Sequence, residues 1–371
     1  MKGKIVDLVA GARPNFVKLA PVVKALREDG QLVPRIVHTG QHYHEGLSDV
    51  FFAQLGIPAP DVHLEVGSGT HGVQTARILE RYETHVMASR PVATVVFGDV
   101  NSTVACGLAA VKLGVPVVHV EAGLRSFDRS MPEEINRLLT DALSDLLLVS
   151  EPSGLKHLQR EGVPKEKVHL VGNTMIDTLL GYLPRARARD RASELRLTKR
   201  QYGLLTLHRP SNVDEPEVLK RLMACFESLN AQLPIVFPVH PRTRAALERA
   251  GIAPSGSVAG RLVYLEPQGY LENLSLMADA AVVLTDSGGM QEETAVLGVP
   301  CITLRENTER PVTVEVGASR LVGNNPERIA QAFEDVVQGT WAKPGDIPLW
   351  DGRAGERIAA VLADWLEVQC Q

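Results

Sequence analysis

Short apolar runs alternate with longer amphipathic stretches along the whole chain. In the first half the apolar runs cover residues 4–10, 36–40, 94–99, 115–123, 146–150 and 169–172. Amphipathic segments of helical length, such as residues 16–28 and 102–113, lie between most of them. The rhythm returns at residues 202–209, 235–240, 262–267, 280–289 and 300–306. Strands that alternate with helices favour a parallel, doubly wound sheet, so the pattern predicts an α/β protein with two Rossmann-like domains in series.

The boundaries of these domains follow from the same pattern. We expect a first domain at residues 1–172, a connector at residues 173–200, a second domain at residues 201–354, and a last helix at residues 355–371 that crosses back to the first domain. The connector contains arginines that alternate with alanine and are interspersed with acidic residues. Mixed charge of this kind is typical of a solvated helical face and argues against a nucleic-acid patch.

Length, charge and cysteine content indicate the number of domains, the kinds of partner and the cellular compartment to expect. A chain of 371 residues is too long for one ordinary core, which agrees with two domains. The net charge of −5 is spread along the chain and predicts neither a nucleic-acid nor a membrane partner. The run at residues 4–10 is interrupted by Asp7 and is too short for a secretory signal. Four widely separated cysteines have no metal-type spacing, so we expect a reducing cytoplasm.

Two glutamates mark the most informative stretch. Glu121 directly follows the buried run at residues 115–120, and Glu133 comes twelve residues later, after Pro132. Groups at the carboxyl ends of parallel strands face the ligand crevice, so Glu121 should point into a cleft. A pair of acids at a helix start explains Glu133 and Glu134 equally well.

Polar residues gather where the predicted strands end, in both domains. They lie at residues 11–18, 39–44, 98–103 and 121 in the first domain, and at residues 208–209, 240–242, 286–289 and 309–311 in the second. A single charged strand end can be a cap or a structural ion pair. Because both domains present such residues on the same edge, we predict a ligand cleft between them.

The segment 286–293 has the features of a nucleotide diphosphate site. Its two glycines follow an apolar strand and open a helix, where free N–H groups and the positive end of the helix dipole attract phosphate. Glu293 lies one to two turns into that helix, where its carboxylate can accept two hydrogen bonds from a ribose diol. A plain tight turn between strand and helix is the alternative.

Two other sequence patterns were considered as a dinucleotide-binding site and as a metal site, and neither is supported. Residues 67–72 match G-x-G-x-x-G, but residues 61–66 alternate polar and apolar positions, so the buried strand of a dinucleotide site is missing. We interpret this segment as a surface excursion with a glycine loop over the cleft. His42 and His44 are close in sequence, and His119 precedes Glu121 by two residues, yet no set of three metal ligands emerges. His119 is better explained as a buried strand histidine.

Taken together, the chain resembles the non-hydrolysing UDP-N-acetylglucosamine 2-epimerases over nearly its whole length. The marks of the resemblance, in order, are Gly11-Ala-Arg-Pro14 with Lys18, Gly98-Asp99, segments 119–125 and 132–137, His208-Arg209, Pro238-Val-His240, Thr285-Asp-Ser-Gly-Gly289 with Glu292-Glu293, and Thr308-Glu-Arg-Pro311. The resemblance implies two domains like those of GT-B glycosyltransferases, with UDP held mainly by the second and the sugar facing the first.

The resemblance also assigns roles by matched position. The catalytic positions are those of Asp99, Glu121, Glu133, His208 and Lys18. The substrate-binding positions are those of Arg13, Gln268, Asn273, Ser287, Gly288, Gly289, Glu293 and Arg310. At Asn273 many relatives carry an aromatic residue near the uracil, so base stacking is either weaker here or supplied by Leu274.

The reaction implied is reversible epimerisation at carbon 2. UDP leaves by anti elimination to give 2-acetamidoglucal, and UDP adds back after the opposite face has been reprotonated. Two of the three carboxylates would act as base and acid, and cations would stabilise the leaving diphosphate. The residues that end the fourth strand differ from those of hydrolysing relatives, so the resemblance favours epimerisation over hydrolysis. The alternatives left open are a UDP-diacetamido-uronic acid as substrate, and a GT-B glycosyltransferase that uses a UDP-sugar.

The resemblance further implies a homodimer and a second UDP-sugar site found in many bacterial relatives. Positions of that second site fall on Gln41, His42, His44, Arg209 and His240. The loop at residues 68–70 lacks the arginine that would contact the activator's diphosphate. We therefore expect little or no activation by a second substrate molecule.

Overall fold

The computed structural model describes residues 4–41, 56–252 and 262–369. The chain divides into two compact units. Unit 1 combines residues 1–178 with residues 348–371, and unit 2 is the continuous segment 179–347. Unit 2 is therefore inserted into the sequence of unit 1.

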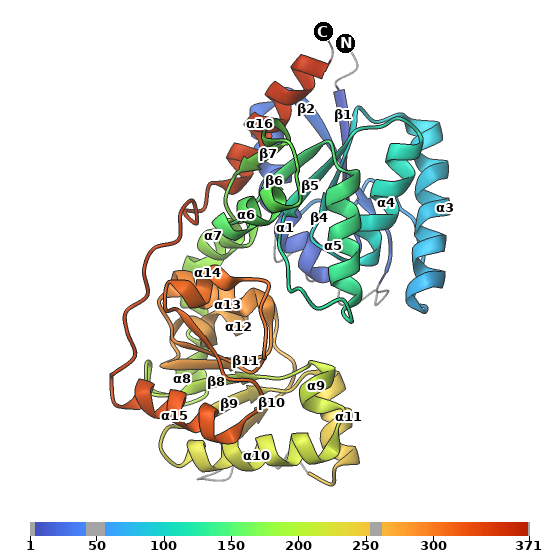
Figure 1. Ribbon diagram of the computed structural model, residues 1–371. Helices are drawn as coiled ribbons and strands as arrows, with labels where there is room; N and C mark the ends of the chain where they lie inside the picture. The colour runs from blue at the N-terminus through green and yellow to red at the C-terminus, as the bar shows by residue number, and fades with distance from the viewer. Residues whose placement is uncertain (1–3, 42–55, 253–261, 370–371) are drawn as a thin grey trace. The chain divides into compact units, whose positions relative to one another are not determined.

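Unit 1 contains a parallel seven-stranded sheet in the order β3-β2-β1-β4-β5-β6-β7 (Figure 1). Its strands are β1 (Lys4–Ala10), β2 (Leu32–His38), β3 (Val62–His63), β4 (Ala93–Phe97), β5 (Val117–Ala122), β6 (Leu146–Val149) and β7 (Val168–Leu170). Strands β4, β5 and β6 are buried at every position. Strands buried at every position suit a sheet that is covered on both faces.

Helices cover both faces of this sheet (Figure 1). On one side α1 (Arg13–Asp29) packs against α16 (Ala354–Gln369), and on the other α3 (His71–Ser89), α4 (Asn101–Lys112) and α5 (Pro132–Leu143) form a layer. The unit also contains α6 (Pro152–Arg160), a short 3-10 helix (Lys165–Lys167) and the first residues of α7 (Thr174–Arg189). Gly355 allows α1 and α16 to approach closely, since a Cβ atom at this position would lie 2.7 Å from the carbonyl oxygen of Pro21.

Unit 2 repeats the design with a six-stranded parallel sheet in the order β10-β9-β8-β11-β12-β13. Its strands are β8 (Gly203–Thr206), β9 (Ile235–Pro238), β10 (Val263–Leu265), β11 (Val282–Thr285), β12 (Cys301–Thr303) and β13 (Ser319–Leu321). Its helices, after the end of α7, are α8 (Arg191–Glu194), α9 (Pro210–Val213), α10 (Pro216–Asn230), α11 (Pro241–Arg249), α12 (Tyr270–Ala278), α13 (Gly288–Leu297), α14 (Pro311–Glu315) and α15 (Pro326–Val337).

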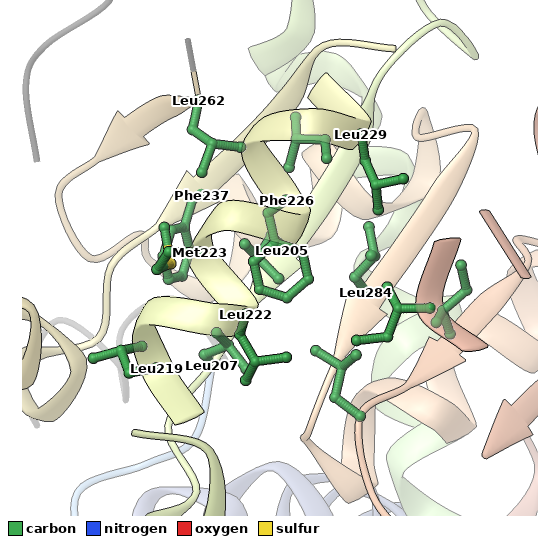
Figure 2. Packing of buried hydrophobic residues seen from close by; sticks show 14 of the residues in the cluster. Leu205, Leu207, Leu219, Leu222, Met223, Phe226, Leu229, Phe237, Leu262 and Leu284 are labelled. Atoms are coloured by element: carbon green, nitrogen blue, oxygen red, sulfur yellow. The ribbon is translucent and has the colours of Figure 1, made fainter. Parts of the chain in front are cut away.

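The core of unit 2 is formed where α10 packs on the sheet. Figure 2 shows Leu222 and Phe226 of this helix beside Leu205, Phe237 and Leu284, which come from three neighbouring strands. All five side chains are fully buried. Each contributes roughly 1.5–3 kcal/mol relative to exposure, so this layer holds the sheet rigid beneath its strand ends.

The prediction of two doubly wound parallel sheets is confirmed, although short elements were missed. Segment 61–66 was interpreted as a surface excursion, but Val62 and His63 form β3 and pair with β2. A strand of two residues is too short to give a periodic signal. Strand β2 begins at Leu32, before the predicted run at 36–40, and includes Pro34. Proline is tolerated there because β3 pairs only with the far end of β2.

Both sheets place a topological switch point at equivalent strands. In unit 1 the strand order reverses between β1 and β4, and in unit 2 between β8 and β11. Ligands of open α/β sheets bind outside the carboxyl ends of the strands at such points. The loops that follow these four strands are therefore where candidate functional residues should lie.

Candidate functional site

Glu121 sits at a distortion at the carboxyl end of β5. The pairing between β5 and β6 shifts register between Val120 and Ala122, and Glu121 has a φ of 75°. This left-handed conformation is uncommon for a residue with a Cβ atom and costs of the order of 1–3 kcal/mol. The Glu121 residue is only 8% exposed. Such strain is typical of functional positions, because surrounding structure must maintain it.

Lys18 of α1 forms an ion pair with the Glu121 carboxylate. The amine packs over Gly98, where a Cβ atom would lie 2.9 Å from the Lys18 Nζ. Asn15 fixes the start of α1 nearby, because its side-chain oxygen accepts the N–H of Ala12 at 3.0 Å and its amide donates to the Phe97 carbonyl at 3.0 Å. The ends of β4 and β5 and the start of α1 therefore bring two predicted catalytic groups together.

Asp99 is held by helix α5. Arg137 forms an ion pair with Asp99 and, on its other side, lies 2.5 Å from a Glu134 carboxylate oxygen. Asn136 donates to the backbone carbonyl of Asp99 at 2.9 Å. Glu133 is half-buried in the first turn of the same helix, beside the buried Glu134. Helix α5 thus carries Glu133 and orients Asp99.

Glu134 has a structural role at this helix start. Its carboxylate accepts the Ser126 N–H and hydroxyl, each at 2.9 Å, and the Phe127 N–H at 2.9 Å. Burial opposes ionisation, but the hydrogen bonds from Ser126 and the charge of Arg137 outweigh it and lower the pKa of Glu134. Of the two adjacent acids, Glu134 therefore fastens the preceding loop.

In unit 2, His208 and Asp286 meet at the switch point between β8 and β11. Asp286 is fully buried and lies 2.8 Å from the Nδ1 of His208. Its carboxylate also accepts the N–H groups of His208 and Arg209 at 3.0 and 2.9 Å and the Asn212 amide at 3.1 Å. These contacts lower the pKa of Asp286 although burial raises it. The ionised Asp286 fixes the imidazole, whose side chain is 41% exposed.

The glycine turn after β11 provides an anion-binding helix start. Ser287 is the N-cap of α13, which begins at Gly288 and Gly289. A Cβ atom at Gly288 would lie 3.7 Å from an Arg310 guanidinium nitrogen, so the arginine lies over the turn. Arg310 is held by Glu292 at 2.9 Å. Backbone N–H groups, helix dipole and guanidinium together form a site suited to a diphosphate.

Glu293 lies further along α13 and is 5% exposed. Tyr270 donates a hydrogen bond from its hydroxyl to the Glu293 carboxylate at 3.0 Å. Burial, with a smaller contribution from the charge of Glu292, raises the pKa of Glu293 to about 7, although the bond from Tyr270 lowers it. The side chain therefore changes its charge near neutral pH.

The predicted uracil-side residues lie at the start of α12. Gln268 accepts a bond from Arg191 at 3.3 Å and donates to the Glu266 carbonyl at 2.7 Å. Asn273 is half-buried in the helix. Leu274 is only 1% exposed, so it packs into the core and presents no surface for base stacking.

The positions expected for a second site fall in both units. In unit 1 Gln41 accepts a hydrogen bond from Ser102 at 2.9 Å. In unit 2 Arg209 donates to the Asp286 carbonyl at 3.0 Å, and the His240 ring lies 5.8 Å from the His208 ring. His42 and His44 lie outside the described residues, as does the side chain of Arg13.

Several residues of these clusters were not singled out from the sequence. Arg137 binds Asp99, Asp286 binds His208 and Tyr270 bonds to Glu293, while Asn15 fixes the start of α1. Polar residues that are buried beside strand ends are the signal that could have identified them, but burial is not visible in the sequence pattern of α5 or α12. Within the described ranges, no cluster of three or more His, Cys, Asp or Glu side chains could hold a metal ion.

Membrane-spanning helices were also sought. None of the helices in residues 4–41, 56–252 and 262–369 is both long and apolar enough to cross a bilayer.

Comparison with known proteins gives a consistent result. The family model described as UDP-N-acetylglucosamine 2-epimerase matches residues 24–363. The UDP-N-acetylglucosamine 2-epimerase of Methanocaldococcus jannaschii is 42% identical over 96% of this chain and 98% of its own. The crystal structure of that enzyme in complex with UDP-GlcNAc and UDP matches with a TM-score of 0.87, covering 97% of this chain and 99% of that one.

Two further relatives bear on substrate and fold. The UDP-2,3-diacetamido-2,3-dideoxy-D-glucuronate 2-epimerase of Pseudomonas aeruginosa is 40% identical over 97% of this chain and 99% of its own. The glycosyltransferase of kitacinnamycin shares only 12% identity but matches over 100% of both chains with a TM-score of 0.56, which shows a common GT-B-like fold and nothing about activity.

Proposed function

The chain belongs to the UDP-N-acetylglucosamine 2-epimerase family, and we propose that it interconverts UDP-N-acetylglucosamine and UDP-N-acetylmannosamine. The observation that carries the proposal is the strained Glu121, which pairs with Lys18 next to Gly98, the residue before Asp99. Holding UDP alone needs no such carboxylates. A reaction that removes and returns a proton on a sugar carbon does need them.

In this proposal unit 2 holds UDP. The N–H groups of Gly288 and Gly289, the Ser287 side chain and the Arg310 guanidinium bind the diphosphate, which suits the start of a ten-residue helix. Glu293 accepts the ribose hydroxyls from its buried position. Gln268 and Asn273 are assigned to the uracil through the family resemblance, as Arg13 is to phosphate.

His208 is assigned to the departing diphosphate. Asp286 binds the Nδ1 side of the ring, so the Nε2 side is the one available to a developing negative charge. Preorganised donors of this kind contribute roughly 3–4 kcal/mol each in enzymes that stabilise oxyanions. Arg310 adds a positive charge to the same diphosphate.

The carboxylates of unit 1 are assigned to proton transfer. Elimination removes the proton from carbon 2 and breaks the bond from carbon 1 to the UDP oxygen, leaving 2-acetamidoglucal. Re-addition returns a proton to the opposite face of carbon 2 and re-forms the bond to UDP. We propose that two of Asp99, Glu121 and Glu133 act as base and acid, with Lys18 balancing the charge of Glu121.

A second substrate is favoured by a specific relative. The 40% identical protein of Pseudomonas aeruginosa acts, by its name, on a UDP-diacetamido-glucuronate. The same machinery could epimerise that sugar, because the reacting carbon and the leaving group are equivalent. The two candidates therefore differ only in what recognises carbons 3 and 6.

The experiment incubates the purified protein in deuterated water with each UDP-sugar separately and without an acceptor. Conversion of UDP-N-acetylglucosamine to the manno epimer with deuterium at carbon 2 is expected, and Glu121→Gln protein prepared identically should be inactive. Turnover of the uronate alone would select the second candidate. Product that retains its original hydrogen at carbon 2 would refute the elimination route.

The resemblance also supports a homodimer that works in the cytoplasm. Light scattering of the purified protein tests the dimer, and a mass of 40.3 kDa would contradict it.

A further inference from the structure

The imidazole of His119 is fully buried in β5 between two acceptors. Its Nδ1 lies 2.6 Å from a carboxylate oxygen of Asp141, and its Nε2 lies 2.8 Å from the carbonyl oxygen of Gly98. A carbonyl oxygen can only accept, so Nε2 carries a proton. The expectation of a buried strand histidine is confirmed, and the ring also joins two strand ends to a helix.

Asp141 of α5 is held as a carboxylate. Its second oxygen accepts the N–H of Gly123 at 3.0 Å and lies 2.7 Å from the Arg125 guanidinium. Burial opposes ionisation, but His119 and Arg125 outweigh it and lower the pKa of Asp141. The Nδ1 of His119 therefore bonds to a carboxylate that Gly123 and Arg125 hold in place from its other oxygen.

This buried His119–Asp141 pair fixes the backbone on both sides of the predicted catalytic carboxylates. The bonded carbonyl belongs to Gly98, the residue before Asp99, and the bonded N–H belongs to Gly123, two residues after Glu121. Both glycines have positive φ, of 64° and 80°. The strained conformation of Glu121 persists only if its surroundings enforce it.

We propose that the His119–Asp141 pair is a positioning element for proton transfer, which sets where Asp99 and Glu121 meet the sugar without touching the substrate. The inference rests on the proposed epimerase function. The pair acts through main-chain bonds at Gly98 and Gly123, so its loss should misplace the carboxylates and leave UDP binding intact. Misplacement of about 1 Å can reduce a rate by about a hundredfold.

The same sheet offers a matched control. Asp7 in β1 is fully buried and lies 3.0 Å from the Nε2 of His85 in α3. It also bonds to Arg35 at 2.6 Å. This second aspartate–histidine pair lies three residues before the end of β1, and neither partner is adjacent in sequence to a predicted catalytic residue. Breaking it should affect folding stability alone.

The experiment compares His119→Gln with His85→Gln in the full chain. Glutamine carries its donors on one nitrogen and cannot reach acceptors on opposite sides as the His119 ring does, and at position 85 it loses the ring contact with Tyr82. Both variants should therefore melt at lower temperature. Only His119→Gln should lower kcat, by roughly 10- to 100-fold, with calorimetric UDP affinity unchanged within about twofold. Equal kcat in the two variants, or an equal loss of UDP affinity and kcat in His119→Gln, would overturn the proposal.

Two further measurements protect the test against a variant that does not fold. Asp141→Asn keeps the shape of the side chain but replaces one accepting oxygen with an amide N–H₂ group. This donor must then face either the Gly123 N–H or the His119 ring, so kcat should fall while KM changes little. Nitrogen NMR of the wild-type protein should show a proton on the Nε2 of His119, and a ring without one would overturn the proposal, because it could not bond to the Gly98 carbonyl. Wild-type protein without epimerase activity would instead count against the proposed function.

Discussion

Replacing Glu293 with glutamine should stabilise the ligand-free protein at alkaline pH and weaken UDP binding. Glu293 has a folded-state pKa of about 7 against 4.5 in the unfolded chain, chiefly because it is buried. Between these pH values the folded protein binds more protons than the unfolded chain, so folding stability falls as the pH rises. The full cost of the buried charge is present above pH 7 and amounts to about 3 kcal/mol.

Glutamine cannot ionise and can still accept the hydrogen bond of Tyr270 through its side-chain oxygen. Chemical unfolding of both proteins should therefore give a difference in free energy of unfolding that is close to zero near pH 4.5. The difference should grow to about 3 kcal/mol in favour of the variant at pH 8. Other titrating groups are shared by the two proteins and cancel in this comparison. A difference that is the same at pH 5 and pH 8 would refute the assigned effect of burial.

UDP binding should show the opposite preference. The two ribose hydroxyls donate to the ionised carboxylate of Glu293, so UDP binds best to the ionised form. Below pH 7 Glu293 is protonated, and UDP binding must be coupled to loss of that proton. Calorimetry should find that the advantage of wild type over Glu293→Gln decreases about tenfold from pH 8 to pH 6. Taking the ratio of affinities removes the titration of the UDP phosphate itself. A ratio independent of pH would show that the ribose does not contact this carboxylate.

Two further outcomes are expected. Gly98→Ala should destabilise unit 1 by about 1 kcal/mol or more and reduce kcat, because the position has positive φ and the new Cβ would lie 2.9 Å from the amine of Lys18. The control Gly107→Ala, whose Cβ would meet only Val117 at 3.7 Å, should leave kcat unchanged. Equal activity in both variants would argue against packing of Lys18 over Gly98. A reaction started from the manno epimer alone should proceed without a lag, and a reaction silent until a trace of the gluco epimer is added would contradict the expected absence of activation.

Local patterns predicted those parts of the site that lie at strand ends. Glu121 and the turn at Ser287 were predicted because apolar runs end beside them and glycine opens the next helix, whereas the role of Lys18 was predicted from the family resemblance. The same reasoning gave both sheets, since buried parallel strands are continuous apolar runs.

Long-range partners were not predictable in this way. Asn15 bonds to the carbonyl of Phe97, 82 positions away, and Tyr270 reaches Glu293 across 23 positions. Hydrophobic periodicity states which face of an element is buried but not which distant polar group meets it there. The positive φ of Glu121 also left no trace, because the sequence has glutamate where glycine would be expected.

The insertion of unit 2 into unit 1 has a consequence for synthesis on the ribosome. Helix α16 buries Ile358, Leu362 and Leu366 in unit 1, and its Gly355 packs directly on α1. At translation rates of about 5–20 residues per second, this helix emerges roughly 10–35 s after the first segment of unit 1 is complete. Unit 2 is continuous and can fold during that interval. The nascent first unit must meanwhile keep the surface of α1 that α16 will cover exposed, so this surface is open to aggregation until the end of the chain is made.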